Sequence, residues 1–298
     1  MEFAQLEMFV AVAEHGGITA AAEKLLRAPS NVSTRIRHLE KELGTDLLLR
    51  DKRQVTLSAE GEAFLEYARR LIDLAREAKS LATGEQPCGR FRIGALESTS
   101  AVRIPSLLAE FHLSYPAVDL ELEAGASGML FDHVLNGQVN AVFTDGAPAS
   151  PVLTGLHAFT EHLVILTPES VRVIDDEFRQ SHPTVFVFGT VCSYRQRFED
   201  WLTANGITPG RVVEISSYYS MLACVAAGAG ICMMPLCLFE SLPGSNRVVC
   251  HPIEGELGRA ETWLTWRRDA RSANLRAFVR QVRDHLVPPS GHEAVCAA

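Results

Sequence analysis

The sequence lacks the features that would place the chain in a membrane or around a metal ion. Its apolar stretch 221–234 is interrupted by glycine and is too short to span a bilayer. The first residues include Glu2 and Glu7 and no basic segment, so we expect no signal peptide. The seven cysteines form no C-x-x-C pair, and their odd number in apolar stretches indicates reduced thiols of a cytoplasmic protein. We therefore expect no metal and no cofactor.

Basic residues are fewer than acidic ones, so the 298 residues carry a formal net charge of −8. The basic residues are nevertheless concentrated near the start of the chain. Residues 24–53 hold eight Lys or Arg and four Asp or Glu, which gives this segment a net charge of +4. An acidic chain is unsuited to coating nucleic acid with its whole surface. One local basic patch is nevertheless compatible with nucleic-acid binding.

The residues up to Gly44 are patterned as short helices, the last two of them joined by a turn. Apolar residues recur at helical spacing over 3–15, and Gly16 ends that helix. Thr19 is expected to cap a short helix over 20–26, and Ser30 to cap a second helix that ends at Gly44. One face of this second helix is apolar, and the other carries small polar and basic side chains that can reach base edges or phosphates. The pattern is that of a helix-turn-helix.

A charged ribbon follows these helices. Residues 47–50 and 55–57 predict two short strands around the charged turn 51–54, which is typical of a basic wing. The alternative is a small helical domain whose charged helix is simply solvated. The ordered set of three helices and a basic ribbon favours the winged helix-turn-helix.

A long helix is predicted next, with Ser58 as its cap and residues 59–82 as its body. Its apolar residues form an a/d seam of Phe64, Tyr67, Leu71, Leu74, Ala78 and Leu81. A second stripe consists of Leu65, Ala68, Ile72 and Ala75. The seam either buries against the winged domain or, as its regularity favours, pairs with a second subunit. Residues 83–87 break the helix and form a hinge.

The remaining two thirds alternate strand and helix patterns, including a helix over 99–115 and a final one over 273–286. This alternation predicts mostly parallel sheets with helices on both faces, so ligands are expected at the carboxyl ends of strands. Suitable side chains follow three of these strands: Glu97, Ser98, Thr99, Ser100; Thr144, Asp145; and Cys192, Ser193, Tyr194. Cys192 is interpreted as a structural thiol rather than a redox switch.

The segments LEMFVAVAEHGGITAAAEKL, STRIRHLEKELGTDLLLR and VTLSAEG resemble the LysR-type transcriptional regulators, and the order of parts does so over residues 1–286. The resemblance implies a winged helix-turn-helix DNA-binding domain (1–58), a linker helix with its hinge (59–87) and an effector-binding domain (90–288). This last α/β domain is similar to periplasmic binding proteins. Its subdomain I would be 90–160 plus 268–288, its subdomain II would be 161–267, and a cleft would lie between them.

The resemblance also implies which residues contact DNA: Ser30, Asn31, Ser33, Thr34 and Arg37 in the recognition helix, and Arg50 and Arg53 in the wing. The family commonly has a glutamine where this chain has Pro29, so Asn31 is expected to replace that amide. The implied partners are double-stranded promoter DNA, a small-molecule effector and further copies of the chain, as a homodimer or homotetramer, without a membrane.

The charge of the effector is predicted from the same strand ends. Hydroxyls and free backbone N–H groups there usually favour anions. Glu97 and Asp145 instead favour an amine, with Tyr194, Tyr218 and Tyr219 as aromatic walls, unless the two carboxylates only cap neighbouring helices. The segment LESTSAVRIP resembles a putrescine-utilisation regulator subgroup, which also favours an amine.

Two other functions are weighed against the regulator. The first alternative is an enzyme built on the α/β half, with the first domain used only for dimerisation. No acid/base pair, nucleophile motif or metal cluster in the sequence supports it. The basic helix and wing argue against a small-molecule binding protein without a DNA role. We therefore expect no catalytic residues.

Overall fold

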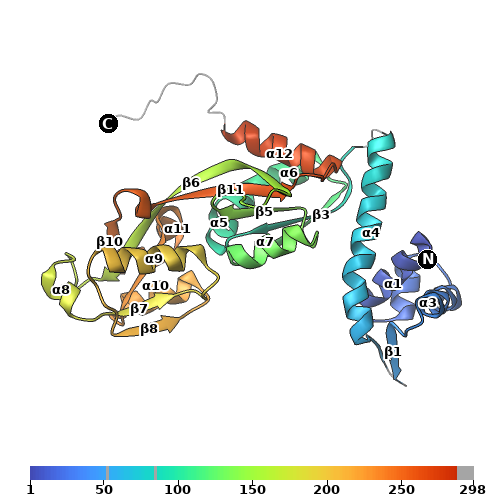
Figure 1. The fold of residues 1–298 in the computed structure, drawn as a ribbon, viewed down its shortest axis with the longest axis horizontal. Coiled ribbons are helices and arrows are strands. Elements are labelled where there is room, and N and C mark those ends of the chain that lie inside the picture. Colours follow the sequence, from blue (N-terminus) through green and yellow to red (C-terminus); the bar gives the residue numbers. More distant parts are fainter. Residues whose placement is uncertain (52–53, 84–85, 287–298) are drawn as a thin grey trace. The chain divides into compact units, whose positions relative to one another are not determined.

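The structure is a computed structural model that describes residues 1–51, 54–83 and 86–286 (Figure 1). The chain divides into two compact units, Met1–Gln86 and Pro87–Ala298. Within the described residues, no helix combines the length and the apolar character that crossing a bilayer requires.

The N-terminal unit is a helix-turn-helix followed by a ribbon and a long helix (Figure 1). Its core is formed by apolar residues of the three short helices, and Ala68 of the long helix is fully buried against them. The elements are α1 (Phe3–His15), α2 (Ile18–Lys24), α3 (Pro29–Leu43), β1 (Leu48–Asp51), β2 (Gln54–Leu57) and α4 (Ala59–Thr83).

The starts of α2 and α3 differ from the prediction. The N-cap of α2 is Gly17, where we expected Thr19. The N-cap of α3 is Ala28, so Ser30 lies inside the first turn and does not cap the helix. Pro29 is the first helical residue, because its missing N–H would have no partner there and its φ is already helical.

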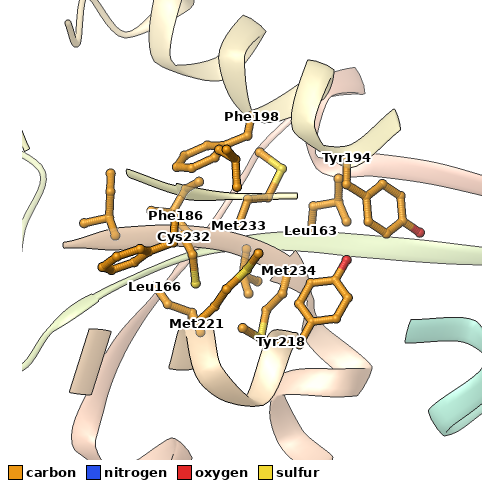
Figure 2. Packing of buried hydrophobic residues seen from close by; sticks show 14 of the residues in the cluster. Leu163, Leu166, Phe186, Tyr194, Phe198, Tyr218, Met221, Cys232, Met233 and Met234 are labelled. Atoms are coloured by element: carbon orange, nitrogen blue, oxygen red, sulfur yellow. The ribbon is translucent and has the colours of Figure 1, made fainter. Parts of the chain in front are cut away.

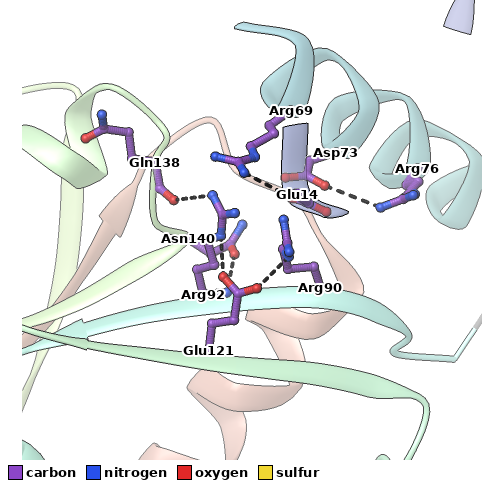
Figure 3. Close-up of polar contacts among 9 residues, drawn as sticks. All are labelled: Glu14, Arg69, Asp73, Arg76, Arg90, Arg92, Glu121, Gln138 and Asn140. Carbon is purple, nitrogen blue, oxygen red and sulfur yellow. Dashed lines mark hydrogen bonds and ion pairs between the residues drawn. The ribbon is translucent and has the colours of Figure 1, made fainter. Parts of the chain in front are cut away.

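The predicted cap of α4 is confirmed. The Ser58 hydroxyl accepts the N–H of Gly61 at 2.9 Å and donates to the Asp46 carbonyl at 2.6 Å. Further along α4, Arg69 pairs with Glu14 of α1 at 3.1 Å (Figure 3). These contacts hold the first half of α4 on its own unit.

The C-terminal unit is built on one mixed sheet with the strand order β4-β3-β5-β11-β6-β9-β7-β8, and β10 pairs with β6. The strands β6 (Leu153–Pro168) and β11 (Arg259–Arg267) run antiparallel to each other and join the two halves. We call β6 and β11 the bridging strands. The sheet is less parallel than predicted, because every pairing of the bridging strands is antiparallel.

The half that precedes the bridging strands, with the last helix, is called lobe I. It consists of β3 (Gly89–Ala95), α5 (Glu97–Val102), α6 (Ile104–Ser114), β4 (Val118–Ala124), α7 (Ser127–Leu135), β5 (Ala141–Asp145) and α12 (Ala273–Leu286). The pairs β3–β4 and β3–β5 are parallel. Arg90 and Arg92 of β3 both pair with Glu121 of β4, each at 2.6 Å (Figure 3).

The other half is called lobe II. It consists of α8 (Asp176–Gln180), β7 (Thr184–Val187), α9 (Ser193–Ala204), β8 (Arg211–Glu214), α10 (Tyr218–Ala226), β9 (Ile231–Pro235), α11 (Leu236–Ser241), η1 (Ser245–Arg247), β10 (Val248–Pro252) and η2 (Glu256–Gly258). Figure 2 shows its core, where side chains of β6, β7 and β9 pack against α9 and α10.

The single helix predicted over 99–115 is two helices, α5 and α6, which meet at Arg103. Pro105 explains the break, because proline has no N–H to continue the helical ladder. The elements α8, α11 and β10 and the first half of β6 were not predicted. The final helix has the predicted bounds.

Candidate functional site

The polar side chains of α3 lie on its solvent side. Its apolar stripe is fully buried in the unit: Val32, Ile36 and Leu39. Ser33 is partly exposed, and the other predicted contact residues are exposed: Ser30, Asn31, Thr34 and Arg37. Amphipathic spacing is the reason, since residues three and four apart share one face of a helix.

The two arginines in the middle of α3 differ in their partners. The Arg35 guanidinium pairs with the Glu2 carboxylate at 2.5 Å. Arg37 forms no hydrogen bond or ion pair with any described residue, so its guanidinium is free for a phosphate or a guanine edge. In the predicted wing, Arg53 and the side chain of Arg50 lie outside the described residues.

Glu40 fixes α3 to the ribbon. Its side chain is buried, with 7% exposed, and one carboxylate oxygen accepts the backbone N–H groups of Leu47 at 3.0 Å and Leu48 at 3.1 Å. Bonds from N–H groups to a carboxylate are among the stronger hydrogen bonds in proteins. The start of the ribbon is therefore held at a defined place relative to the exposed face of α3.

The predicted seam of α4 is divided between two environments. Phe64 and Leu71 are partly buried against the core of their own unit. Leu65, Ala68 and Ile72 of the second stripe pack in the same core. Tyr67 and Leu74 are 61% and 62% exposed, and Ala78 is also exposed. The side chain of Leu81 lies outside the described residues. The outward residues of the seam are thus free to meet a further chain.

The three predicted strand ends meet at the junction of the two lobes. The hydroxyl of Ser98 in lobe I lies beside the hydroxyls of Tyr194 and Tyr218 in lobe II, and Tyr194 also lies beside Thr262 of bridging strand β11. Ser127 of α7 and Ser193 of α9 bring their hydroxyls to 3.4 Å across the same junction. We call this junction the inter-lobe cleft, because the resemblance to LysR-type regulators predicts the effector cleft between the two subdomains.

Several buried hydroxyls of the inter-lobe cleft have no hydrogen-bond partner of normal geometry among the described residues: Thr99, Thr144, Tyr194 and Thr262. Each of these residues is at most 4% exposed. Buried polar groups are almost always hydrogen-bonded, so a group of them without partners is expected where a polar ligand or water binds. Burial raises the pKa of Tyr194 and of Tyr218, which keeps both phenols neutral donors.

Asp145 does not offer a free carboxylate to the cleft. Arg197 of α9 binds it through two bonds, from Nε at 3.0 Å and from Nη2 at 3.2 Å, and Asp145 has only 5% of its side chain exposed. We call this ion pair between the lobes the Asp145–Arg197 clasp. Such a bidentate pair neutralises both charges and fixes their geometry. Neither of the alternatives predicted for Asp145, a free carboxylate or a helix cap, describes this arrangement.

Glu97 remains the uncompensated carboxylate of the cleft. It accepts the backbone N–H of Tyr218 and forms no ion pair with any described residue, and burial raises its pKa above the ordinary value. A half-buried carboxylate without a cationic partner favours binding of either a proton or a cationic ligand.

A second charged group links the lobes beside the cleft. The Arg103 guanidinium binds Glu161 of β6 through two bonds, at 2.8 and 3.2 Å, and the Cys237 thiol donates to the same carboxylate at 2.9 Å. The Glu161 side chain is 3% exposed. Burial raises the pKa of Cys237 to about 12, so this thiol stays protonated at neutral pH.

The remaining residues predicted to bind the effector lie further from the centre of the inter-lobe cleft or are bonded within their own helix. Ser100 donates to the carbonyl of Glu97 within its own helix, and Tyr219 is 59% exposed. Cys192 is the N-cap of α9, and burial raises the pKa of its thiol, which agrees with the structural interpretation rather than with an activated thiolate. Sequence reasoning missed Arg103, Glu161, Arg197 and Thr262, whose cleft positions depend on contacts between distant segments.

Comparison with known proteins decides the family. The family described as "LysR substrate binding domain" matches residues 84–287, and "Bacterial regulatory helix-turn-helix protein, lysR family" matches residues 3–62. The chain belongs to the LysR family. It is a DNA-binding transcriptional regulator with a substrate-binding effector domain, and it binds promoter DNA.

Other HTH-type transcriptional regulators match nearly the full chain. The HTH-type transcriptional regulator CzcR of Bacillus thuringiensis subsp. konkukian is 34% identical over 287 residues, which cover 96% of this chain and 98% of that protein. GltR of Bacillus subtilis is 33% identical over 289 residues, covering 96% and 97%.

Solved structures share the fold. A full-length cysteine variant of OxyR from Pseudomonas aeruginosa superposes with a TM-score of 0.67 at 20% identity and covers 95% of each chain. Full-length CbnR in complex with its target DNA superposes with a TM-score of 0.65 at 24% identity, covering 95% of this chain and 99% of that one. These likenesses confirm the predicted fold class.

Proposed function

We propose that this LysR-family regulator recognises its operator with the exposed face of α3 and the tip of the ribbon. The proposed contacts are Ser30, Asn31, Ser33, Thr34, Arg37, Arg50 and Arg53. The observation that supports the α3 part is the unpartnered guanidinium of Arg37 among exposed hydroxyl and amide side chains. The proposed DNA-binding domain is 1–58, with 59–87 as the linker helix and hinge and 90–288 as the effector-binding domain. Its subdomains I and II follow lobes I and II.

Replacing Arg37 by alanine is expected to weaken operator binding by about 1–3 kcal/mol, because a phosphate or base contact is lost. A phosphate contact would also reduce the salt dependence of binding by about one unit, whereas a base contact would relax specificity at one position. Fluorescence anisotropy with an operator fragment at several salt concentrations measures both. Arg35→Ala is the matched control, since it removes the same charge from a guanidinium that Glu2 already engages. Equal affinity of the Arg37→Ala and wild-type proteins would rule out this recognition face.

We propose that the outward residues of α4 join two copies of the chain, which doubles the phosphate contacts available to a weakly basic domain. The support is the exposure of Tyr67 and Leu74 at helical spacing of seven residues. The proposed oligomer is a homodimer or a homotetramer.

Leu74→Glu is expected to dissociate the oligomer, because two glutamates would be buried opposite each other. Leu74 tests the contact between subunits more specifically than Leu71, because Leu71 also packs against its own unit. Analytical ultracentrifugation measures the change. Arg76→Glu is the control, since Arg76 is exposed and lies about 200° around the helix from Leu74. An unchanged sedimentation coefficient in Leu74→Glu would show that this stripe is not the contact.

We propose that the inter-lobe cleft is the effector site and that the effector is a small metabolite with an amine. The unpartnered hydroxyls indicate a polar ligand, and Glu97 supplies the uncompensated negative charge. The proposed site comprises Glu97, Ser98, Thr99, Ser100, Thr144, Asp145, Cys192, Ser193, Tyr194, Tyr218 and Tyr219. The narrower resemblance to putrescine-utilisation regulators finds no support in the names of the relatives, which include CzcR, YusT and GltR.

We also infer that the chain acts in the cytoplasm and is not an enzyme. The support for the first is its role as a promoter-binding regulator. The support for the second is that the sequence offers no acid/base pair or nucleophile motif.

A further inference from the structure

Lobe II contains a cavity of about 370 Å³ that is separate from the inter-lobe cleft. It lies between α8, the C-terminal end of α9, β10 and the start of η2. None of the residues assigned above to the effector site lines it. Its volume is in the range of pockets that hold small organic ligands.

Part of the cavity lining is apolar. Trp201 of α9, which is 8% exposed, forms a wall together with Ile174, Ile253 and Leu257. A flat indole beside aliphatic side chains is suited to a branched aliphatic or aromatic group. The apolar part of a ligand would therefore lie against this wall.

The cavity lining also carries one cation and one anion. The Nε of Arg179 is buried and has no hydrogen-bond partner among the described residues, and its Nη1 meets only the highly exposed Asp176 at 3.3 Å. Exposed ion pairs of this kind are weak, so a ligand carboxylate can bind the Nη atoms of Arg179 instead. Glu254, also in the lining, is exposed and forms no hydrogen bond or ion pair with a described residue.

His251, the remaining titratable group of the lining, adds no charge at neutral pH. Its Nε2 lies 2.8 Å from the Thr167 hydroxyl, which donates to the Val171 carbonyl at 2.7 Å. The Thr167 proton is thus committed, so Nε2 is the donor to this hydroxyl. Burial lowers the pKa of His251, which keeps the ring neutral. One cation and one carboxylate then leave the lining with no net charge.

We propose that this cavity is a second ligand site of the protein, for a small zwitterionic amino acid with an apolar side chain. The ligand carboxylate binds Arg179, its ammonium binds Glu254, and its side chain packs on Trp201. We call the cavity the outer site.

The outer site is joined to the Asp145–Arg197 clasp by two short connections. Arg197 and Trp201 of α9 lie four residues apart, and its C-cap Asn205 follows after four more, so the clasp and the wall of the outer site share one helix face. In addition, Arg197 Nη1 donates to the carbonyl of Glu256 in η2 at 3.4 Å. Occupation of the outer site therefore acts on the segments that hold Arg197 against the other lobe.

Calorimetry with the full chain and L-phenylalanine tests the outer site. We expect binding to the wild type, and at least about tenfold weaker binding of phenethylamine and 3-phenylpropanoate, which lack the carboxylate or the ammonium. Arg179→Gln should weaken L-phenylalanine binding by at least about tenfold, whereas the control Arg172→Gln, at an exposed arginine nearby, should not. No binding to the wild type, or loss in Glu97→Gln with retention in Arg179→Gln, overturns the proposal.

The coupling has its own test. Asp145→Asn opens the clasp, so the affinity for L-phenylalanine is expected to change by at least about fivefold, the lower limit of ordinary coupling between sites. A matched exposed change, Asp119→Asn on β4, should leave that affinity as in the wild type. Equal affinity in Asp145→Asn and the wild type would show that the outer site does not act on the clasp.

Discussion

Replacing Arg103 by methionine is expected to lower the free energy of unfolding of the C-terminal unit by about 3 kcal/mol. The reason is the carboxylate that remains. Glu161 is 3% exposed and receives two bonds from Arg103, so without the guanidinium it is a buried charge held only by the Cys237 thiol. Methionine keeps the length and apolar character that pack near Phe159. We place the effect at the low end of the range for buried pairs because Arg103 itself is 35% exposed.

Urea unfolding measures this loss of stability. Two further variants test whether the loss comes from the orphaned Glu161 carboxylate. Arg259→Met removes an arginine from an exposed pair with Glu261 and is expected to change stability by less than about 1 kcal/mol. Adding Glu161→Gln to Arg103→Met removes the orphaned charge, so the double variant should recover part of the loss. If the free energy of unfolding of Arg103→Met equals that of the wild type within error, Glu161 binds water or another partner in the variant. The Arg103–Glu161 pair would then not hold the lobes together.

The local features were predictable because they depend on neighbours in the sequence. The apolar stripe of α3, its end at Gly44, the Ser58 cap and the whole of α12 follow from helical spacing and capping chemistry. The predicted start of α3 was wrong because two local signals compete there, Ser30 as an N-cap and Pro29 as a first-turn residue. The helix begins with Pro29. Local chemistry also indicated the strand ends that meet at the cleft.

Features that depend on distant pairing were not predictable from one sequence. Asp145 and Arg197 are 52 residues apart, and Arg103 and Glu161 are 58 apart. No periodicity links such partners, so the sequence showed Asp145 as a carboxylate without showing the arginine that neutralises it. The same limit explains the bridging strands, whose antiparallel pairing joins segments about a hundred residues apart. The strand ends that meet between the lobes could be identified from the sequence, but the charge balance at their junction could not.

That charge balance leads to the largest expected change in ligand binding. Glu97→Gln is expected to weaken binding of 1,4-diaminobutane by about 2 kcal/mol or more, which is roughly thirtyfold, because a buried ammonium would lose its counter-charge. Glutamine keeps the size of the side chain and its acceptor for the Tyr218 N–H. Succinate, a dianion of similar length, should bind the wild type weakly and gain affinity in Glu97→Gln.

The titration of Glu97 gives the same prediction a second readout. Burial raises the pKa of this carboxyl in the free protein, whereas a bound ammonium would lower it. Protons therefore compete with the amine, and affinity should fall as the pH drops through the raised pKa and be fully present above it. The pH dependence should disappear in Glu97→Gln and persist in the control Glu123→Gln, at an exposed carboxylate of β4.

The variant Asp145→Asn distinguishes an amine effector from an anionic effector. Removing Asp145 frees the Arg197 guanidinium, so the cleft gains one positive charge and should bind the diamine more weakly and succinate more tightly. Both carboxylate variants thus shift selectivity towards the dianion, Glu97→Gln by losing a counter-charge and Asp145→Asn by exposing a cation. Tight succinate binding to the wild type that neither variant improves, together with no diamine binding, would reject the amine effector and leave a cleft that uses its hydroxyls for an anion.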